Sequence, residues 1–326
     1  MKHLGSERRC WCGGEPWFFN AEYGRCVDCG TLVSKAGLSG RELQVADDEV
    51  DFYGKQYWLD HQSRDLGFPD IRKRARADLT DRNLHWLQSL LRYRLPPAKV
   101  LELGCSHGSF VKLLRQAGYD ATGIEMSPWV VEFGRAAFNV PVLVGPVENL
   151  DIPKESCDII ALMDVLEHLD CPKATMEHCL TLLKPDGLLL VQTPQFRKEM
   201  TYEDLMRTNG AFLGMLRADE HLYLFTEQSV SRLFEDLNCR SIEFMPAIFG
   251  QYDMFFVVSR QAIERVSKEK AEGAMMATPE GRLVLALLDM HERIRFLEAD
   301  GADRLEQIYT LTGMVHELRG VRYNRR

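Results

Sequence analysis

The chain has 326 residues, of which 45% are hydrophobic and 27% are charged, and its formal net charge at pH 7 is −8. This length allows one full α/β core with one or two smaller modules. The sequence has no apolar run long enough to span a membrane and its first residues lack the apolar centre of a signal peptide, so a cytoplasmic protein is expected. Residues 97–260 carry 23 acidic and 14 basic side chains, which argues against a nucleic-acid substrate.

Two cysteine pairs mark the first predicted module, residues 1–45. Cys10 and Cys12 form a C-x-C-G-G pattern, and Cys26 and Cys29 form C-x-x-C-G. Four thiolates on two tight turns can surround one tetrahedral Zn²⁺, which would supply stability that this short segment lacks. The sequence predicts a structural zinc ribbon, with four free thiols as the alternative. A catalytic zinc is not expected, because four cysteines leave no position for water.

Residues 46–96 are predicted to form a helical connecting region. An apolar pattern indicates a helix over about residues 71–93, which ends before Pro96 and Pro97. An aromatic group precedes this helix, and it either covers the active site or packs the ribbon against the core. Its members are Phe52, Tyr53, Tyr57 and Trp58.

Residues 97–260 alternate short apolar runs with helical segments, which is typical of a doubly wound α/β domain with a mostly parallel sheet. Five strands are predicted at residues 99–103, 120–125, 140–145, 157–163 and 187–194. Two further strands, within 240–249 and 251–260, are expected to form an antiparallel hairpin with a short turn at Gly250. The prediction is therefore a seven-stranded sheet.

The stretch VLELGCSHGSF, residues 100–110, joins a buried strand to a glycine-bearing loop and the start of a helix. Glycines at the carboxyl end of the first strand of such a sheet let the backbone approach a nucleotide closely. Glu125 follows about one strand-helix-strand unit later, where a carboxylate can accept hydrogen bonds from both ribose hydroxyls. The spacing E-x-G-x-x-x-G that starts at Glu102 differs from G-x-G-x-x-G, which argues against a nicotinamide oxidoreductase.

With these motifs the chain resembles the class I S-adenosylmethionine-dependent methyltransferases. The resemblance implies a Rossmann-like domain that binds S-adenosylmethionine, with the loop after the first strand at the methionine part and Glu125 at the ribose. The cofactor-binding residues that it implies are Glu102, Gly104, Cys105, Gly108, Glu125, Met126, Val147, Glu148 and Met163.

One cofactor segment departs from that family's pattern. Many relatives have an aspartate that meets the adenine amino group, but Pro146 stands at this place. The backbone N–H of Val147 or the side chain of Glu148 is the expected substitute. Met163 begins the segment MDVLEHL, which is widespread in the family, and its carbonyl is expected to face the cofactor amine.

Two histidines are candidate general bases, because imidazole is easily poised near neutral pH. His168 follows the fourth strand, and His221 follows a long loop over residues 195–220. The motif EHLYLFT around His221 resembles zinc-ribbon sugar methyltransferases, in which an adjacent Glu-His pair acts on the acceptor, and this implies catalytic roles for Glu220 and His221. The tyrosine that some relatives place before this pair is absent, so O-methylation and C-methylation both stay open.

Residues 279–320 are predicted to form a helical heptad tail after a small-residue linker. Eight of ten a and d positions are apolar, which indicates a coiled coil or helical hairpin interrupted around Gly301 and Arg304. The positions are Leu287, Met290, Ile294, Leu297, Gly301, Arg304, Ile308, Leu311, Val315 and Leu318. Such a stripe requires a partner, either a second copy of the chain or its own catalytic domain.

The expected function is methyl transfer from S-adenosylmethionine to a sugar, as a nucleotide sugar or glycan, or to a related small molecule. A catalytically silent, methyltransferase-like scaffold in a biosynthetic complex is the alternative. The expected partners are a small-molecule acceptor and a second copy of the chain, with no nucleic acid and no membrane span.

Overall fold

The computed structural model describes residues 8–35, 38 and 40–323, and it contains the predicted seven-stranded sheet. The strand order is β10-β11-β8-β7-β4-β5-β6, and β11 runs antiparallel to both of its neighbours while the remaining pairs are parallel. The strands are β4 (Lys99–Leu103), β5 (Asp120–Glu125), β6 (Val142–Val144), β7 (Cys157–Met163), β8 (Leu183–Pro194), β10 (Ser241–Met245) and β11 (Asp253–Ser259). This topology confirms the predicted Rossmann-like methyltransferase fold.

Several strand boundaries differ from the prediction, and β6 is shorter than the predicted 140–145. The connection between β10 and β11 covers residues 246–252 rather than a tight turn at Gly250, because β10 ends before Pro246, which has no N–H for the ladder. The loop closes instead through the N–H groups of Tyr252 and Asp253, which both donate to the carbonyl of Phe249. Strand β8 begins at Leu183, four residues earlier than predicted.

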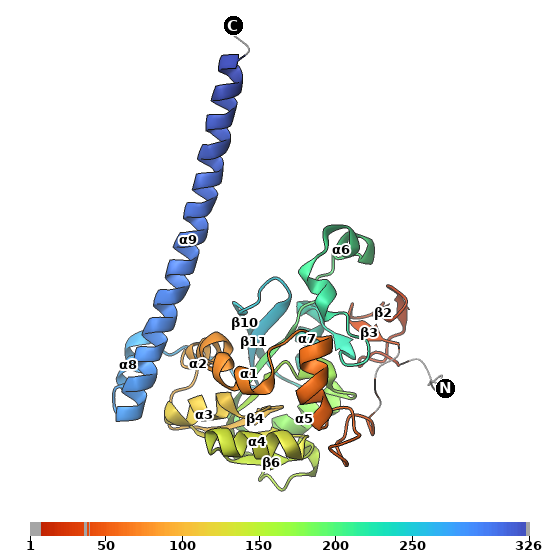
Figure 1. Ribbon diagram of the computed structural model, residues 1–326. Coiled ribbons are helices and arrows are strands. Elements are labelled where there is room, and N and C mark those ends of the chain that lie inside the picture. Colours follow the sequence, from red (N-terminus) through yellow and green to blue (C-terminus); the bar gives the residue numbers. More distant parts are fainter. Residues whose placement is uncertain (1–7, 36–37, 39, 324–326) are drawn as a thin grey trace.

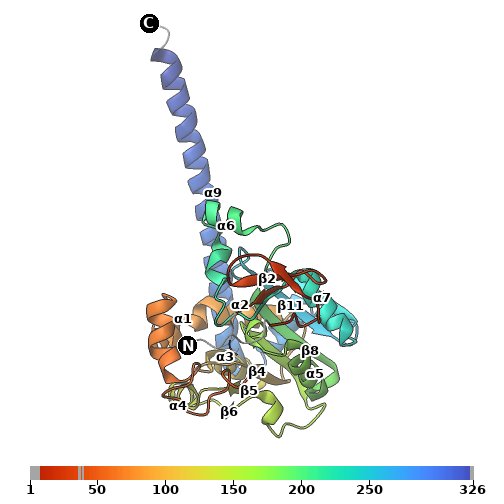
Figure 2. The same ribbon diagram turned by 90° about the vertical axis from the view of Figure 1, so that its right-hand side faces the viewer.

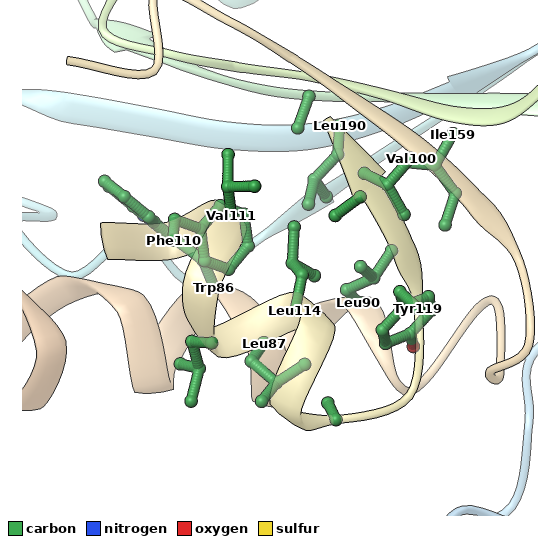
Figure 3. Packing of buried hydrophobic residues seen from close by; sticks show 14 of the residues in the cluster. Trp86, Leu87, Leu90, Val100, Phe110, Val111, Leu114, Tyr119, Ile159 and Leu190 are labelled. Carbon is green, nitrogen blue, oxygen red and sulfur yellow. The ribbon is translucent and has the colours of Figure 1, made fainter. Parts of the chain in front are cut away.

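Helices cover both faces of the sheet (Figures 1 and 2). One face is covered by α2 (Leu84–Leu90) and α3 (Ser109–Gln116), and their buried side chains meet Val100 of β4 and Leu190 of β8 (Figure 3). The other face is covered by α5 (Pro172–Leu182) and α7 (Glu227–Asp236). The remaining helices of this part are η1 (Tyr57–Asp65), α1 (Ile71–Asp78), η2 (Leu79–Asn83), α4 (Pro128–Phe138), η3 (Val147–Asn149), η4 (Leu166–His168), α6 (Tyr202–Thr208) and η5 (Ala211–Met215).

A second, smaller sheet joins the N-terminal segment to the central domain. Strands β1 (Pro16–Phe18), β2 (Tyr23–Cys26) and β3 (Leu32–Ser34) form an antiparallel meander. Its fourth strand is β9 (Tyr223–Leu224), which comes from the EHLYLFT motif and pairs with β3. The cysteine-bearing module is therefore completed by residues that follow His221 directly.

The chain continues into α8 (Lys268–Met275) and the 45-residue helix α9 (Pro279–Tyr323). The first turns of α9 pack against α2 and α3 through Val284 and Leu288, and the rest extends away from the body in both views (Figures 1 and 2). The helix runs without a break through Gly301, where the sequence predicted an interruption. The last predicted seam residue, Leu318, lies outside the side chains that the structure describes.

Despite the length of α9, none of the helices in the described residues is both long and apolar enough to cross a membrane.

Candidate functional site

A cavity of about 550 Å³ opens at the carboxyl ends of β4, β5 and β7, where a doubly wound sheet binds its ligands. It is lined by eight of the nine predicted cofactor-binding residues: Glu102, Gly104, Cys105, Glu125, Met126, Val147, Glu148 and Met163. All three predicted catalytic residues, His168, Glu220 and His221, line the same cavity. The fold thus brings the cofactor loop and the candidate bases to one place.

Gly108, the ninth residue, is not among those that line the cavity. It stands in the left-handed region at φ +78° immediately before α3, and a Cβ there would lie 2.9 Å from a methyl carbon of Val140. Its role in the structure is close packing of the helix start against the strand region. Gly104 does line the cavity, at φ +64°, and a Cβ there would lie 2.5 Å from Val165. Only glycine avoids strain at both positions.

The Glu125 carboxylate holds together the loop after β4 and the start of α4. It accepts hydrogen bonds from the backbone N–H groups of Ser106 at 3.0 Å, Met126 at 2.8 Å and Ser127 at 3.3 Å. Burial raises the pKa of this carboxyl, and the three backbone donors partly oppose that effect. A carboxylate oriented in this way at the edge of the cavity can accept further hydrogen bonds from a ribose diol.

Glu102 presents an unsatisfied acceptor beside the glycine loop. The side chain is buried, and among the described residues its Oε2 atom has no hydrogen-bond partner. Burial raises the pKa of this carboxyl well above its usual value. Since a buried acceptor without a partner is costly, a donor supplied by a bound ligand, such as an ammonium group, would satisfy it.

His168 and His221 form a pair at the far side of the cavity, with ring centroids 4.9 Å apart. The Nδ1 atom of His168 lies 3.0 Å from the carbonyl oxygen of Glu220, and that of His221 lies 2.7 Å from the carbonyl oxygen of Met215. A carbonyl can only accept, so each Nδ1 carries the hydrogen in these bonds and each Nε2 keeps a lone pair. Burial lowers the pKa of both imidazoles, which keeps them neutral and able to accept a proton.

Glu220 is held from the connecting region. Its carboxylate accepts a hydrogen bond from the Tyr57 hydroxyl at 3.0 Å and lies 2.8 Å from Nε2 of His61. The other ring nitrogen of His61 lies 2.7 Å from Asp65. Burial disfavours charge on His61, but hydrogen bonds to the two carboxylates outweigh it and raise its pKa. Glu220 therefore has its charge paired within the site.

The sequence left open whether the aromatic group covers the site or packs the ribbon against the core, and Tyr53 and Tyr57 lie at the site. Both rings line the cavity, and the Tyr53 hydroxyl lies 3.1 Å from Nδ1 of His168. Phe52 lies outside the lining and packs edge-on against Tyr53, with ring centroids 4.9 Å apart. The aromatic group thus forms one wall of the site.

The four cysteines of the N-terminal module lie together. The Sγ atoms of Cys10 and Cys29 are 3.5 Å apart, as are those of Cys12 and Cys26, and all four lie within 4.8 Å of one another. Tetrahedral Zn–S bonds of about 2.3 Å require sulfur–sulfur distances of about 3.8 Å. The donor set and its spacing therefore fit zinc. Glu167, His168 and His221 form a second group whose ligand atoms lie within the same limit, inside the cavity.

The comparisons with known proteins agree with this geometry. A family model described as "Methyltransferase domain" matches residues 73–243, more than half of the chain. The chain belongs to this methyltransferase family. S-adenosylmethionine is the cofactor of class I methyltransferases, and the loop after β4, Glu102 and Glu125 line the cavity at the carboxyl ends of the strands.

Curated relatives of the methyltransferase include two proteins named ubiquinone biosynthesis O-methyltransferase. The one from Xanthomonas campestris pv. campestris is 33% identical over 108 residues, which covers 31% of this chain and 45% of the relative. The one from Haemophilus ducreyi is 31% identical over 105 residues, covering 29% and 44%. The chain thus spans less than half the length of these relatives.

Similar solved structures include two SAM-dependent methyltransferases. The one from Aquifex aeolicus has a TM-score of 0.43 at 16% identity and covers 58% of this chain and 95% of that one. The one from Archaeoglobus fulgidus has a TM-score of 0.43 at 15% identity and covers 54% and 91%.

The sequence did not reveal two contacts in and beside the cavity. His61 was not singled out, although it stands four residues after Tyr57 and therefore on the same helical face. Asp48 was also missed: its carboxylate accepts hydrogen bonds from the Ser127 hydroxyl at 2.8 Å and from the Trp129 N–H at 2.6 Å. It thereby ties the connecting region to the start of α4, directly beside Glu125.

Proposed function

We propose that this methyltransferase methylates a hydroxyl oxygen of a sugar, presented as a nucleotide sugar or glycan, and that a histidine of the His168–His221 pair removes the hydroxyl proton. The pair carries the proposal, because both residues line the cavity that holds the cofactor residues, and the hydrogen bonds of each Nδ1 leave a lone pair on Nε2. A methyl acceptor with a weakly acidic O–H needs such a base.

The chemistry divides between cofactor and chain. When bound, S-adenosylmethionine supplies an electrophilic methyl group with a neutral leaving group. The remaining tasks are to orient the acceptor, to exclude water and to hold the released proton. The aromatic wall of Tyr53 and Tyr57 excludes water, and Glu220 fixes the backbone that orients His168. Transfer of the proton to Nε2 gives an imidazolium whose positive charge is close to Glu167, 3.9 Å from His168.

Two observations support an oxygen acceptor that bears an anionic group. The curated relatives are named O-methyltransferases, which favours oxygen over carbon. Arg217 lines the cavity with its guanidinium 5.5 Å from the ring centroid of Phe68, and its Nε donates to the carbonyl of Gly214 at 2.8 Å. Within the described residues, no ion pair neutralises Arg217. A half-buried guanidinium of this kind suits the diphosphate of a nucleotide sugar.

A screen of acceptors tests this function. Purified protein is incubated with S-adenosylmethionine and a panel of nucleotide sugars, free sugars and phenolic compounds, and products heavier by one methyl group are sought by mass spectrometry. Methylation of at least one nucleotide sugar at oxygen is expected. Products from phenolic compounds alone would contradict the sugar acceptor, and carbon-methylated products would contradict oxygen transfer.

Replacing His221 by glutamine is expected to lower kcat by about 10²- to 10⁴-fold, the usual contribution of a general base. Binding of S-adenosylmethionine, measured by calorimetry, should be unchanged, because the ring lies on the acceptor side of the cavity. His178→Gln is the matched control, since His178 lies on α5 and does not line the cavity. A His221→Gln variant that keeps full turnover would remove His221 from the proposed mechanism.

The pH dependence follows from the lowered pKa values of the two histidines. Burial lowers the pKa of His221 well below its usual value, and the charge of His168 lowers it further. A base of this kind is neutral above its pKa, so kcat should stay level from about pH 8 to about pH 6.5 and fall only below that. The same shift makes the unfolded chain bind more protons below about pH 6.5, so the free energy of unfolding should also decrease there. A kcat midpoint at pH 7 or above would contradict this assignment.

We further propose that Cys10, Cys12, Cys26 and Cys29 bind one structural zinc ion, on the strength of their sulfur spacing. Elemental analysis of freshly purified, unchelated protein should give about one zinc per chain. A value near zero would favour four free thiols.

A further inference from the structure

Helix α9 carries an apolar stripe that nothing in the described chain covers. We define the seam as the a and d positions of α9 from residue 290 to residue 315, and these are Met290, Ile294, Leu297, Gly301, Arg304, Ile308, Leu311 and Val315. The six apolar members are 45–62% exposed, whereas Val284, Leu288 and His291, at the start of the helix, are buried against the body. The seam therefore lies on a different side of α9 from the body and is open to a partner.

Most helical stability in proteins comes from packing an apolar face, so a helix that leaves such a face open to water lacks that support. Gly301 lowers the stability of the isolated helix further, since glycine in a helix interior is less favourable than alanine by about 1 kcal/mol. The stripe thus needs an occupant, and the order of its residues indicates which one.

We propose that two copies of the chain pair through α9 as an antiparallel coiled coil, with the two-fold axis between Ala302 and Asp303. In this register the seam is complementary to itself. Ile294 faces Leu311 of the second copy, and Leu297 faces Ile308. Met290 and Val315 form the next layer outward, so every apolar seam residue meets an apolar residue.

The two irregular positions also match in this register, because Gly301 faces Arg304. The missing side chain of Gly301 leaves room for the aliphatic stem of the arginine, and no atom lies within 4 Å of where its Cβ would be. The Arg304 guanidinium already pairs with Asp300 of the same helix at 2.9 Å, which directs its charge to the edge of the seam. The central layer therefore buries neither an empty space nor an unpaired charge.

A parallel pair is less favourable on the same residues. It would place Arg304 against Arg304, so that two positive charges repel each other in the seam. It would also place Gly301 against Gly301, which leaves a gap in the next layer. A parallel pair would gain an ion pair between Arg293 of one copy and Glu298 of the other, at positions beside the seam. Exposed ion pairs of that kind contribute little to stability. The antiparallel arrangement also sets the two catalytic bodies at opposite ends of the bundle, whereas a parallel pair would bring them to the same end.

Charge exchange on the full-length chain distinguishes these arrangements. Wild type is expected to be a dimer by light scattering coupled to gel filtration. Ile294→Lys and Leu311→Glu, made singly, should each weaken dimerisation by at least about 100-fold, because each places two charges in the seam of the symmetric dimer. The double variant should recover the dimer, since each new lysine then faces a new glutamate of the other copy. Glu306→Lys, at an outer f position, is the matched control and should leave the dimer unchanged.

The helix content of every variant is checked by circular dichroism, so that loss of pairing is separated from loss of folding. A wild-type monomer at tens of micromolar would overturn the proposal, and would point to another protein as the occupant of the seam. A dimer that neither single substitution weakens would do the same. A double variant that stays monomeric would exclude the antiparallel register. Oxidation of a mixture of two single variants, Leu297→Cys and Ile308→Cys, gives an independent check. The antiparallel pair should give cross-links between the two different variants, whereas a parallel pair would join each variant only to itself.

Discussion

Replacing Glu125 by glutamine is expected to weaken binding of S-adenosylmethionine by at least about 100-fold, as measured by calorimetry. The reason is that the variant loses the negative charge that would accept both ribose hydroxyls while the surrounding loop keeps its shape. Glutamine keeps only one oxygen, so either the Ser106 N–H or the N–H groups of Met126 and Ser127 lose their acceptor, and a modest loss of thermal stability is expected. The dissociation constant for the cofactor should therefore change far more than Tm.

Glu132→Gln provides the control for this experiment. Glu132 lies on the exposed side of α4, the same helix whose start Glu125 holds, and its substitution removes the same charge from the same neighbourhood. Cofactor binding by Glu132→Gln should match that of the unmodified chain. If Glu125→Gln bound the cofactor as tightly as its control, the ribose assignment would be wrong.

Replacing Cys26 by serine is expected to lower turnover by about 100-fold without abolishing cofactor binding. The physical reason is the pairing of β3 with β9, which places the residues just after Glu220 and His221 on the edge of the cysteine-bearing sheet. The Tyr23 hydroxyl donates to the carbonyl of His221 at 2.9 Å, and the Ser34 hydroxyl donates to the carbonyl of Ala218 at 2.6 Å. Loss of the proposed zinc ion is expected to loosen these supports and to displace the proposed catalytic pair.

The measurement compares zinc content, kcat and cofactor affinity of Cys26→Ser with those of Cys239→Ser. Cys239 is a buried thiol outside both the cluster and the cavity lining. The control should retain zinc and turnover. Full turnover in a zinc-free Cys26→Ser protein would show that the ribbon does not position the catalytic segment.

The strands of the central sheet could be predicted because their signals are local. Strands β4, β5 and β7 have the predicted bounds, since each is an apolar run with polar or turn residues on both sides. The cofactor loop follows from the same logic: glycines and acids at the ends of these strands are brought to one edge by the parallel topology. The sequence could not show that close packing against Val140 also requires glycine at position 108, because that distance depends on how the chain folds.

The acceptor side of the site could be predicted only in part. His168, Glu220 and His221 were found through their motifs. The hydrogen-bonded row Asp65–His61–Glu220, in contrast, joins residues that are far apart in sequence. No periodicity links them, because their contact depends on how the connecting region folds over the sheet. The strand β9 was missed for a similar reason: two residues give no pattern, and their partner β3 belongs to another module.

The sheet that β3 shares with β9 also affects the order in which parts of the protein fold during synthesis. Strand β3 leaves the ribosome early, but its partner β9 is synthesised nearly two hundred residues later, after most of the central domain. Contacts between such distant segments carry a large loop-closure cost and form late, once intervening parts have folded. We therefore expect nascent chains to acquire a nucleotide-binding core before they acquire a competent acceptor site, which makes methylating activity the last property to mature.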